Sequence, residues 1–328
     1  MIHIPVMSRE VMVTLNPQAG DSLLDATVGH GGHTQAYLSA GGSRVVGIDA
    51  DAAALAVAQQ TLTSNENRAR LIVGTFAALQ ELVGKEQFTH VLFDLGIGSH
   101  QLADPKRGFS FQATGPLTMR YASTGSAQVA LPPSDIQGIA WLERRLGFPP
   151  DVRELITGLP EAELADLIWQ YGEERYSRRI ARAIKQQAGS IQTAVELAQA
   201  IASATPASYE RGRMHPATRT FQAFRLAVNR ELESLRLALP QAVNVLKDGG
   251  KLAVISFHSL EDRIVKQYFK QDARLKILTK KPIQAEQDEI QQNSRSRSAK
   301  LRVAQKIDIK KQTHDSKHLT TRHPSPPR

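Results

Sequence analysis

Nearly continuous apolar runs alternate with helix-like stretches in the first hundred residues of the chain. Four runs have the length and apolar content of buried strands: Ser22–Ala26, Arg44–Ile48, Arg70–Val73 and Thr89–Asp94. Helices are predicted between them over His33–Ser39 and over the Ala-rich stretch Ala52–Gln60. Strands without polar alternation, separated by helices, are typical of a parallel sheet that helices cover on both faces. The pattern therefore predicts an α/β domain.

The next strand of this quality comes much later, at Lys251–Phe257, after a helix predicted over Leu237–Leu246 and broken at Pro240. A crossover between parallel strands needs about a dozen residues, whereas 156 residues separate Asp94 from Lys251. Three helical stretches fill the middle of this gap: Glu161–Tyr171, Tyr176–Gln187 and Thr193–Ser203. We therefore expect a small helical domain inserted into the α/β domain.

Beyond Phe269 the pattern weakens. Gln284–Lys300 is polar, Leu301–Ile309 predicts one more strand, and the Pro-containing end His314–Arg328 predicts disorder. The sequence therefore predicts an α/β domain in two parts, residues 1–106 and 213–312. Between them lies an inserted helical domain over residues 107–212, and a disordered basic tail follows over residues 313–328.

Charge adds a feature at the C-terminal end. The net charge of +9 is carried by residues 270–328, where 15 Lys and Arg stand against 6 Asp and Glu. A basic segment on a neutral body favours contact with a polyanion, RNA or DNA before a membrane. Charge alone fits a solubilising tail equally well.

Composition excludes several classes of protein. The chain has no Cys, which rules out disulfides and thiolate metal sites and fits a reducing cytoplasm. We expect no metal site. No apolar stretch reaches about 18 residues, the length of a membrane span, and the N-terminus lacks the pattern of a signal peptide.

A Gly-rich loop over Asp25–His33 directly follows the first predicted strand. Such a loop lets the backbone approach a ligand, and the next helix turns its N–H groups toward it. Asp49 ends the second strand, where a carboxylate can accept hydrogen bonds from both ribose hydroxyls of an adenine nucleoside. The loop lacks the G-x-G-x-x-G pattern of dinucleotide sites, and a carboxylate at Asp25 suits a sulfonium better than a pyrophosphate. The loop therefore favours S-adenosylmethionine, while Asp25 serves equally well as a cap of the turn.

Two more residues follow strands at the same predicted edge. Phe76 comes just after the third strand, where such folds place a residue against adenine, although a core position fits it equally well. Asp94 ends the fourth strand and precedes the flexible loop Gly96–Gln101. Because the carboxyl ends of strands in an open α/β sheet face the ligand crevice, we expect Asp94 and this loop to meet both donor and acceptor.

Longer motifs then match a known family. They are His3–Val6, Asp25–His33, Asp94–Gln101, Arg107–Phe111, Gly115–Arg120, Tyr171–Arg175, His215–Gln222, Ile255–Lys266 and Asn293–Arg302. Through them the chain resembles the bacterial MraW/RsmH family of ribosomal RNA cytosine-N4 methyltransferases. The resemblance implies a class I (Rossmann-like) S-adenosylmethionine methyltransferase fold with an inserted helical domain. It also implies a cytoplasmic enzyme that methylates N4 of a cytidine in the decoding region of 16S ribosomal RNA, within the assembled small subunit.

The resemblance carries the family's donor site onto Gly31, Gly32, His33, Asp49, Phe76, Asp94 and Gln101. The chain departs from the family beside this site. Gly98-Ser99-His100 stands where Ser-Ser-Pro is usual, Thr118 replaces an Asp, and a further Asp after Gln101 is missing. Residues 129–157 look like an extra segment. These departures affect the expected contacts with the substrate, whereas the Gly-rich loop Asp25–His33 matches the family pattern.

Cations and aromatic residues interleave in the matching motifs, a pairing that single-stranded RNA uses for stacking and phosphate contact once the target base is unstacked. The aromatic members Phe109, Phe111, Phe221 and Phe224 are individually better explained as core residues. His258 follows the fifth strand and can contact RNA or cap the next helix. We predict substrate contacts from Arg107, Arg219, Arg225, His258 and Arg263, and a catalytic role for Asp94 in holding the reacting amine.

Three other functions fit parts of the sequence. A non-enzymatic RNA-binding assembly factor would not need the intact Gly-rich loop and Asp49. A nicotinamide dehydrogenase would need the dinucleotide pattern. A DNA methyltransferase acting on the same amine is the nearest alternative, but its Asp/Asn/Ser-Pro-Pro-Tyr signature is missing after the fourth predicted strand.

Overall fold

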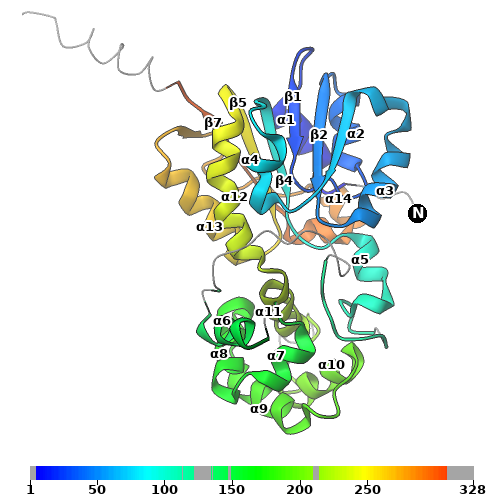
Figure 1. Ribbon diagram of the computed structural model, residues 1–328, viewed down its shortest axis with the longest axis vertical. Helices are drawn as coiled ribbons and strands as arrows, with labels where there is room; N and C mark the ends of the chain where they lie inside the picture. Colours follow the sequence, from blue (N-terminus) through cyan, green and yellow to red (C-terminus); the bar gives the residue numbers. More distant parts are fainter. Residues whose placement is uncertain are drawn as a thin grey trace, which may run out of the picture.

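A computed structural model describes residues 5–112, 114–121, 134, 136–146, 149–209 and 214–308. An α/β part forms the upper half of the molecule in Figure 1, and a bundle of helices lies below it. The predicted basic tail at 313–328 and part of the extra segment at 129–157 lie outside the described residues. Among the residues described, no helix is long and apolar enough to cross a membrane.

The described part of the chain forms a seven-stranded sheet in the order β3-β2-β1-β4-β5-β7-β6. Its strands are β1 (Ser22–Asp25), β2 (Arg44–Asp49), β3 (Ala69–Val73), β4 (Phe88–Asp94), β5 (Leu246–Ser256), β6 (Leu275–Ile277) and β7 (Lys300–Lys306). The predicted parallel sheet is confirmed for β1 to β5. The additional strand expected over Leu301–Ile309 is β7, which pairs antiparallel with both β5 and β6.

Helices cover both faces of the sheet because its strands are apolar on both sides. Leu23 and Leu24 are fully buried neighbours on β1 that point to opposite faces. Leu23 packs with α1 (Ser8–Leu15) and α2 (Gly32–Ser39). Leu24 packs with the helices of the other face, which are α4 (Leu79–Val83), α12 (Glu231–Val245) and α13 (Ser259–Gln271). α3 (Ala52–Thr61) also packs against the sheet, beside β2 and β3. α14 (Gln287–Gln292) lies next to the start of α1, where Glu289 accepts the N–H of Met7 at 2.6 Å.

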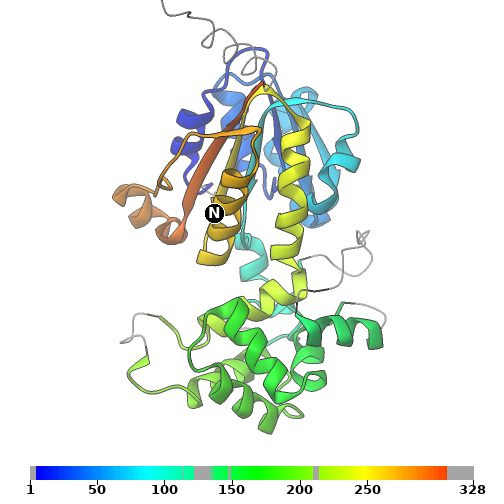
Figure 2. The same ribbon diagram turned by 90° about the vertical axis from the view of Figure 1, so that its left-hand side faces the viewer.

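Pro240 does not break the helix in which it lies, contrary to the prediction. α12 runs without interruption from Glu231 to Val245. Proline removes one helical hydrogen bond, but Leu239 and Ala242 on either side of it are fully buried against the sheet. This burial keeps the helix continuous, and Figure 2 shows it reaching down from the sheet toward the lower helices.

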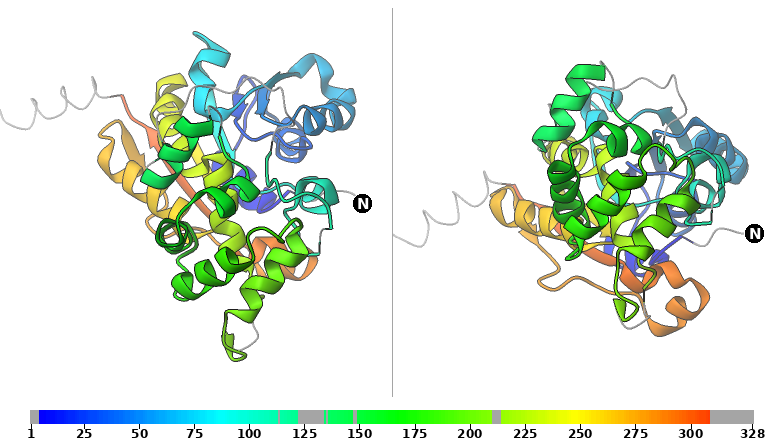
Figure 3. Two further views of the ribbon diagram at one scale, coloured as in Figure 1. Left: turned by 60° about the horizontal axis from the view of Figure 1, so that its bottom comes forward. Right: turned by 90° about the horizontal axis from the view of Figure 1, so that it is seen from below.

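The helical part contains the three helices predicted from the sequence. They are α8 (Glu161–Gly172), α9 (Ser177–Gln187) and α10 (Ala194–Ser203). The others in its described residues are α6 (Gln137–Leu146), α7 (Val152–Gly158) and α11 (Thr218–Asn229). The short helix α5 (Ser99–Ala103) follows β4 and contacts Asp51 of the α/β part. Seen from below, α6 to α10 lie in front of the α/β part (Figure 3).

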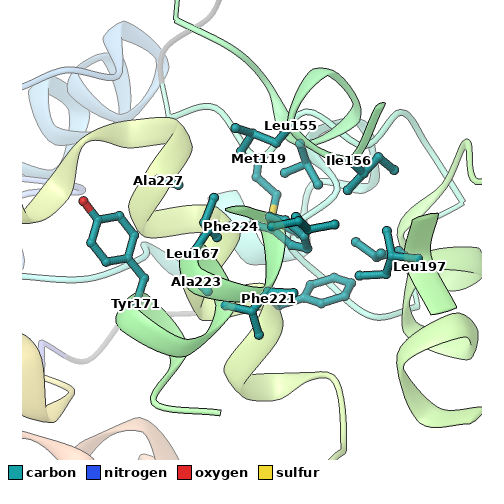
Figure 4. Packing of buried hydrophobic residues seen from close by; sticks show 14 of the residues in the cluster. Met119, Leu155, Ile156, Leu167, Tyr171, Leu197, Phe221, Ala223, Phe224 and Ala227 are labelled. Atoms are coloured by element: carbon teal, nitrogen blue, oxygen red, sulfur yellow. The ribbon is translucent and has the colours of Figure 1, made fainter. Parts of the chain in front are cut away.

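One hydrophobic cluster holds the helical part together. Phe221 and Phe224 of α11 point into it among Leu167 of α8 and Leu197 of α10 (Figure 4). Phe109 belongs to the same cluster, so the core interpretation of these aromatic residues is confirmed. The cluster continues through α11, past the proposed boundary at residue 212. That boundary remains a proposal, and the packing favours one closer to the end of α11.

The buried pair His90 and Tyr37 predicts a pH effect on stability. The Tyr37 hydroxyl lies 2.8 Å from Nδ1 of His90, and burial lowers the pKa of His90 from 6.5 to about 4. The folded state therefore binds this proton less readily than the unfolded state. The stabilisation is complete above pH 6.5 and is lost as pH falls toward 4, by about 2 to 3 kcal/mol.

Urea unfolding of the wild type and of His90→Phe at pH 7.5 and pH 4.5 tests this prediction. The comparison is needed because burial raises the pKa of Asp25 to about 6, which acts in the opposite direction over the same pH range. We expect the wild type to lose about 2 to 3 kcal/mol more than the variant on acidification. Parallel pH profiles would show that His90 does not titrate in this way.

Candidate functional site

A cavity of about 800 Å³ opens where the carboxyl ends of the five parallel strands meet. The loops that follow these strands line one side of it. Residues of α11 and of the first turns of α12 line the other side, so the cavity lies between the α/β part and the helical part. Its volume is in the range of about 300 to 1,000 Å³ that is usual for small-molecule sites.

The Gly-rich loop makes a tight turn between β1 and α2. Gly31 has a positive φ of 85° at the N-terminus of α2, and its N–H donates to the carbonyl of Val28 at 2.8 Å. This conformation favours glycine. Gly32 and His33 line the cavity, whereas Gly31 shapes the turn behind them.

Asp49 lies at the end of β2 on the cavity wall. Its two carboxylate oxygens accept the N–H groups of Gly29 and Asp51, each at 2.8 Å. Burial raises the pKa of Asp49, although these two hydrogen bonds act against the shift. The carboxylate therefore fixes the Gly-rich loop and retains lone pairs for a ligand that enters the cavity.

His33 and Asp94 face each other across the cavity wall. Nε2 of His33 lies 3.5 Å from Oδ2 of Asp94, which is long for a hydrogen bond. Both ring nitrogens of His33 and Oδ1 of Asp94 are buried without a hydrogen-bond partner in the protein. Burial lowers the pKa of His33, but the nearby carboxylates of Asp94, Asp25 and Glu289 outweigh it and raise the pKa above its ordinary value. Orphaned buried polar atoms of this kind fit a polar ligand.

Asp25 does not line the cavity. Its carboxylate accepts the hydroxyl of Thr34 at 2.8 Å and the N–H of Thr27 at 3.3 Å. The side chain is buried beneath the loop, and burial raises its pKa to about 6. Of the two roles considered from the sequence, the structure gives it the one of capping the turn.

Phe76 and Gln101 complete the predicted donor residues on the cavity wall. The Phe76 ring packs edge-on against Phe93, with centroids 5.7 Å apart. Gln101 lies on α5, where its Oε1 accepts the N–H of Gly98 at 3.0 Å. Its Nε2 approaches Oδ2 of Asp51 at 3.4 Å. The structure thus brings together residues that follow β1, β2, β3 and β4.

Of the five predicted substrate residues, Arg225 alone lines the cavity. Its guanidinium forms two contacts with the carboxylate of Glu231, at 2.9 and 3.1 Å. Tyr121 adds a third partner for Glu231, because its hydroxyl donates to Oε1 at 2.9 Å. This buried group of Arg225, Glu231 and Tyr121 forms the cavity wall opposite the Gly-rich loop.

The other four predicted substrate residues lie off the cavity wall, and their roles in substrate binding stay predictions. Arg219 donates to the backbone carbonyl of Glu173, and Arg263 pairs with the carboxylate of the same residue, both at 2.9 Å. Arg107 pairs with Asp51 at 2.8 Å. His258 caps α13 by accepting the N–H of Glu261 at 3.5 Å, as the alternative interpretation proposed.

Several residues of the cavity wall were not found from the sequence. They are His30, Arg120, Tyr121, Asn229, Arg230, Glu231, Arg295 and Ser298. Those between Arg120 and Glu231 come from segments that only the folded chain brings to the strand ends. His30 lies inside the Gly-rich loop, and that position is the one signal that could have identified it. Across the described ranges, no group of three or more His, Asp or Glu side chains is arranged to hold a metal ion.

Comparisons with known proteins give a consistent match. The model of the MraW methylase family matches residues 1–142 and 150–307. A ribosomal RNA small subunit methyltransferase H of Synechococcus elongatus is 43% identical, over 93% of this chain and 95% of that protein. The same enzyme of Sorangium cellulosum is 44% identical, over 93% and 91% of the two chains. A solved rRNA methylase structure from Clostridium thermocellum, described as putative, is 14% identical with a TM-score of 0.42, and covers 94% of this chain and 100% of its own.

Proposed function

The chain belongs to the MraW methylase family, and on that premise we propose that it is an S-adenosylmethionine-dependent methyltransferase of small-subunit ribosomal RNA. Its fold is the Rossmann-like class I methyltransferase fold. The observation that carries the proposal is the cavity at the strand ends, where Asp49 and the pair His33 and Asp94 face a space large enough for a nucleoside. Relatives named for this activity align with 93% of the chain.

The residues of the cavity fit the donor. Asp49 and Phe76 both line the cavity. In this proposal the Asp49 carboxylate accepts the ribose hydroxyls and the Phe76 ring packs against the adenine. Gly32 and the unpartnered nitrogens of His33 are available to the amino-acid end. Gly31 holds the turn, and Gln101 closes the wall from α5. When bound, S-adenosylmethionine supplies a methyl group on a sulfonium, which is already activated for displacement.

We further propose that the acceptor is N4 of a cytidine in the decoding region of 16S ribosomal RNA, within the assembled small subunit in the cytoplasm. The family resemblance supports this choice of nucleotide. The N4 lone pair is delocalised into the cytosine ring, so an acceptor that holds the amino group helps the reaction. Oδ1 of Asp94 is buried at the cavity without a partner and suits that role. The protein otherwise has to position the two reactants and exclude water.

Transfer of a tritiated methyl group tests the proposal directly. Full-length protein is incubated with labelled S-adenosylmethionine and either assembled small subunits or naked 16S ribosomal RNA, and the modified nucleotide is mapped by mass spectrometry. We expect label on N4 of one cytidine in the assembled subunits. No incorporation into either substrate, or label on another atom, would overturn the assignment.

A further inference from the structure

Two histidine rings stack across one side of the cavity. His30 comes from the Gly-rich loop and His100 from α5, and both line the cavity. Their ring centroids lie 4.4 Å apart, with an angle of 28° between the planes. The two rings form a histidine stack. It joins the loop after β1 to the loop after β4, the two segments that carry His33, Asp94 and Gln101.

A buried carboxylate anchors the histidine stack from behind. Asp51 is 1% exposed and caps α3 by accepting the N–H of Ala53 at 3.0 Å. Its Oδ2 lies 3.2 Å from Nε2 of His100 and 2.8 Å from Nη1 of Arg107. Burial opposes ionisation of Asp51, but the hydrogen bond and charge of Arg107 outweigh it and lower the pKa of the carboxyl. The charged, buried carboxylate of Asp51 therefore holds the His100 ring through Nε2.

The helix that carries His100 is too short to be stable alone. α5 has five residues, and isolated helices shorter than about 12 residues are marginal in water. Tertiary contacts must therefore hold α5 and Gln101 in place on the cavity wall. The described tertiary contacts of its His100 and Gln101 side chains are with His30 and Asp51.

We propose that the histidine stack, anchored by Asp51, positions α5 against the methyl donor and so contributes to donor affinity. His30 and His100 are positioning residues in this proposal, which rests on the proposed function. The stack closes the donor side of the cavity by joining the Gly-rich loop to α5. At the strand ends themselves the two segments are already linked, because the N–H of Asp94 donates to the Thr27 hydroxyl at 2.7 Å. Losing either ring frees α5 to move away from the Gly-rich loop, and the donor then has to order this segment when it binds.

The test is a double-mutant cycle on donor-site affinity. Full-length wild type, His30→Ala, His100→Ala and the double variant are titrated with S-adenosylhomocysteine by calorimetry. Each single variant is expected to bind roughly three- to tenfold more weakly, the range set by a stacked ring pair. The double variant should bind no more weakly than the poorer single variant, because the two rings act as one unit. Effects that multiply, or unchanged affinities, would overturn the proposal.

Conservative variants of His100 distinguish the contribution of ring stacking from that of the contact with Asp51. His100→Phe keeps a ring for stacking and loses the contact with Asp51, whereas His100→Asn keeps a polar group and loses the stack. We expect the Phe variant to retain more affinity than the Asn variant. In methyl-transfer assays KM for the donor should rise in the Ala variants while kcat is preserved, a split that a general loss of folded protein would not produce.

A matched control comes from another stacked histidine, which lies outside the cavity. His215 stacks on Phe111 in the helical part, with centroids 4.6 Å apart, and does not line the donor cavity. His215→Ala is expected to leave S-adenosylhomocysteine affinity unchanged. A wild type that binds no S-adenosylhomocysteine would contradict the proposed function and the histidine stack together. A wild type that binds it, with unaffected His30 and His100 variants, would contradict the histidine stack alone.

Discussion

Replacing Asp94 with asparagine is expected to reduce methyl transfer by a factor on the order of 100 to 1,000 while the protein still folds. Oδ1 of Asp94 is buried at the cavity with no partner in the protein, and Oδ2 faces the His33 ring at 3.5 Å. The carboxylate is thus available to hold the reacting amine and to balance the cationic donor. Asparagine has the same shape but lacks the charge, so the loss is one of chemistry rather than packing.

Single-turnover transfer to assembled small subunits, together with calorimetric titration of S-adenosylhomocysteine, measures this effect. A loss confined to the rate assigns Asp94 to the acceptor, and a loss of affinity assigns it to the donor. Asp248→Asn is a matched control, because Asp248 is 61% exposed at the opposite end of β5. Full activity in the Asp94 variants, alanine included, would remove this residue from the site.

Replacing Glu231 with alanine is expected to lower the free energy of unfolding by about 3 to 5 kcal/mol. Glu231 binds the Arg225 guanidinium through two contacts, and both side chains are largely buried. Burial alone would lower the pKa of Arg225, but Glu231 and the nearby Tyr121 and Glu261 raise it instead. Without Glu231 the guanidinium stays charged and largely buried, and Glu261 compensates only in part. The Tyr121 hydroxyl also loses its acceptor.

Urea unfolding monitored by circular dichroism tests the prediction on a set of variants. The double variant Arg225→Met with Glu231→Leu should be less destabilised than Glu231→Ala, because it leaves no unpaired charge. Glu161→Ala breaks an exposed pair with Arg182, whose atoms lie 3.3 Å apart, and should cost less than about 1 kcal/mol. Equal effects from Glu231→Ala and Glu161→Ala would show that the buried pair contributes no more than a surface one.

Much of the α/β part could be predicted because its signals are local. β1 to β4 coincide with apolar runs, and Asp51 caps α3, whose start the sequence had located. Pro240 was misjudged because the burial that offsets its lost hydrogen bond comes from the sheet. The antiparallel direction of β7 depends on how the chain returns after α13, which strand composition does not encode.

The position of the proposed donor residues on the cavity wall was predictable for a related reason. Asp49 and Asp94 each end a strand, and Phe76 stands three residues after β3. Parallel strands bring their carboxyl ends to one edge of the sheet. The cavity wall formed by α11 and α12 was not predictable in this way. Arg107 was expected to contact RNA, and in the structure it pairs with the buried Asp51.

The sequence by itself therefore determined β1 to β4, the Gly-rich turn and the family, because apolar runs, glycine turns and long motifs are local features of the chain. It did not indicate β6, and it placed the start of β5 five residues too late. Only the tertiary structure decided which carboxylate each arginine meets, that His30 and His100 stack, and that Tyr121 and Glu231 form the opposite wall of the cavity. The physical reason is the short range of contacts between polar side chains. A long polar side chain pairs with whatever group packing brings within about 3 Å, and that distance is set by contacts between segments far apart in the chain.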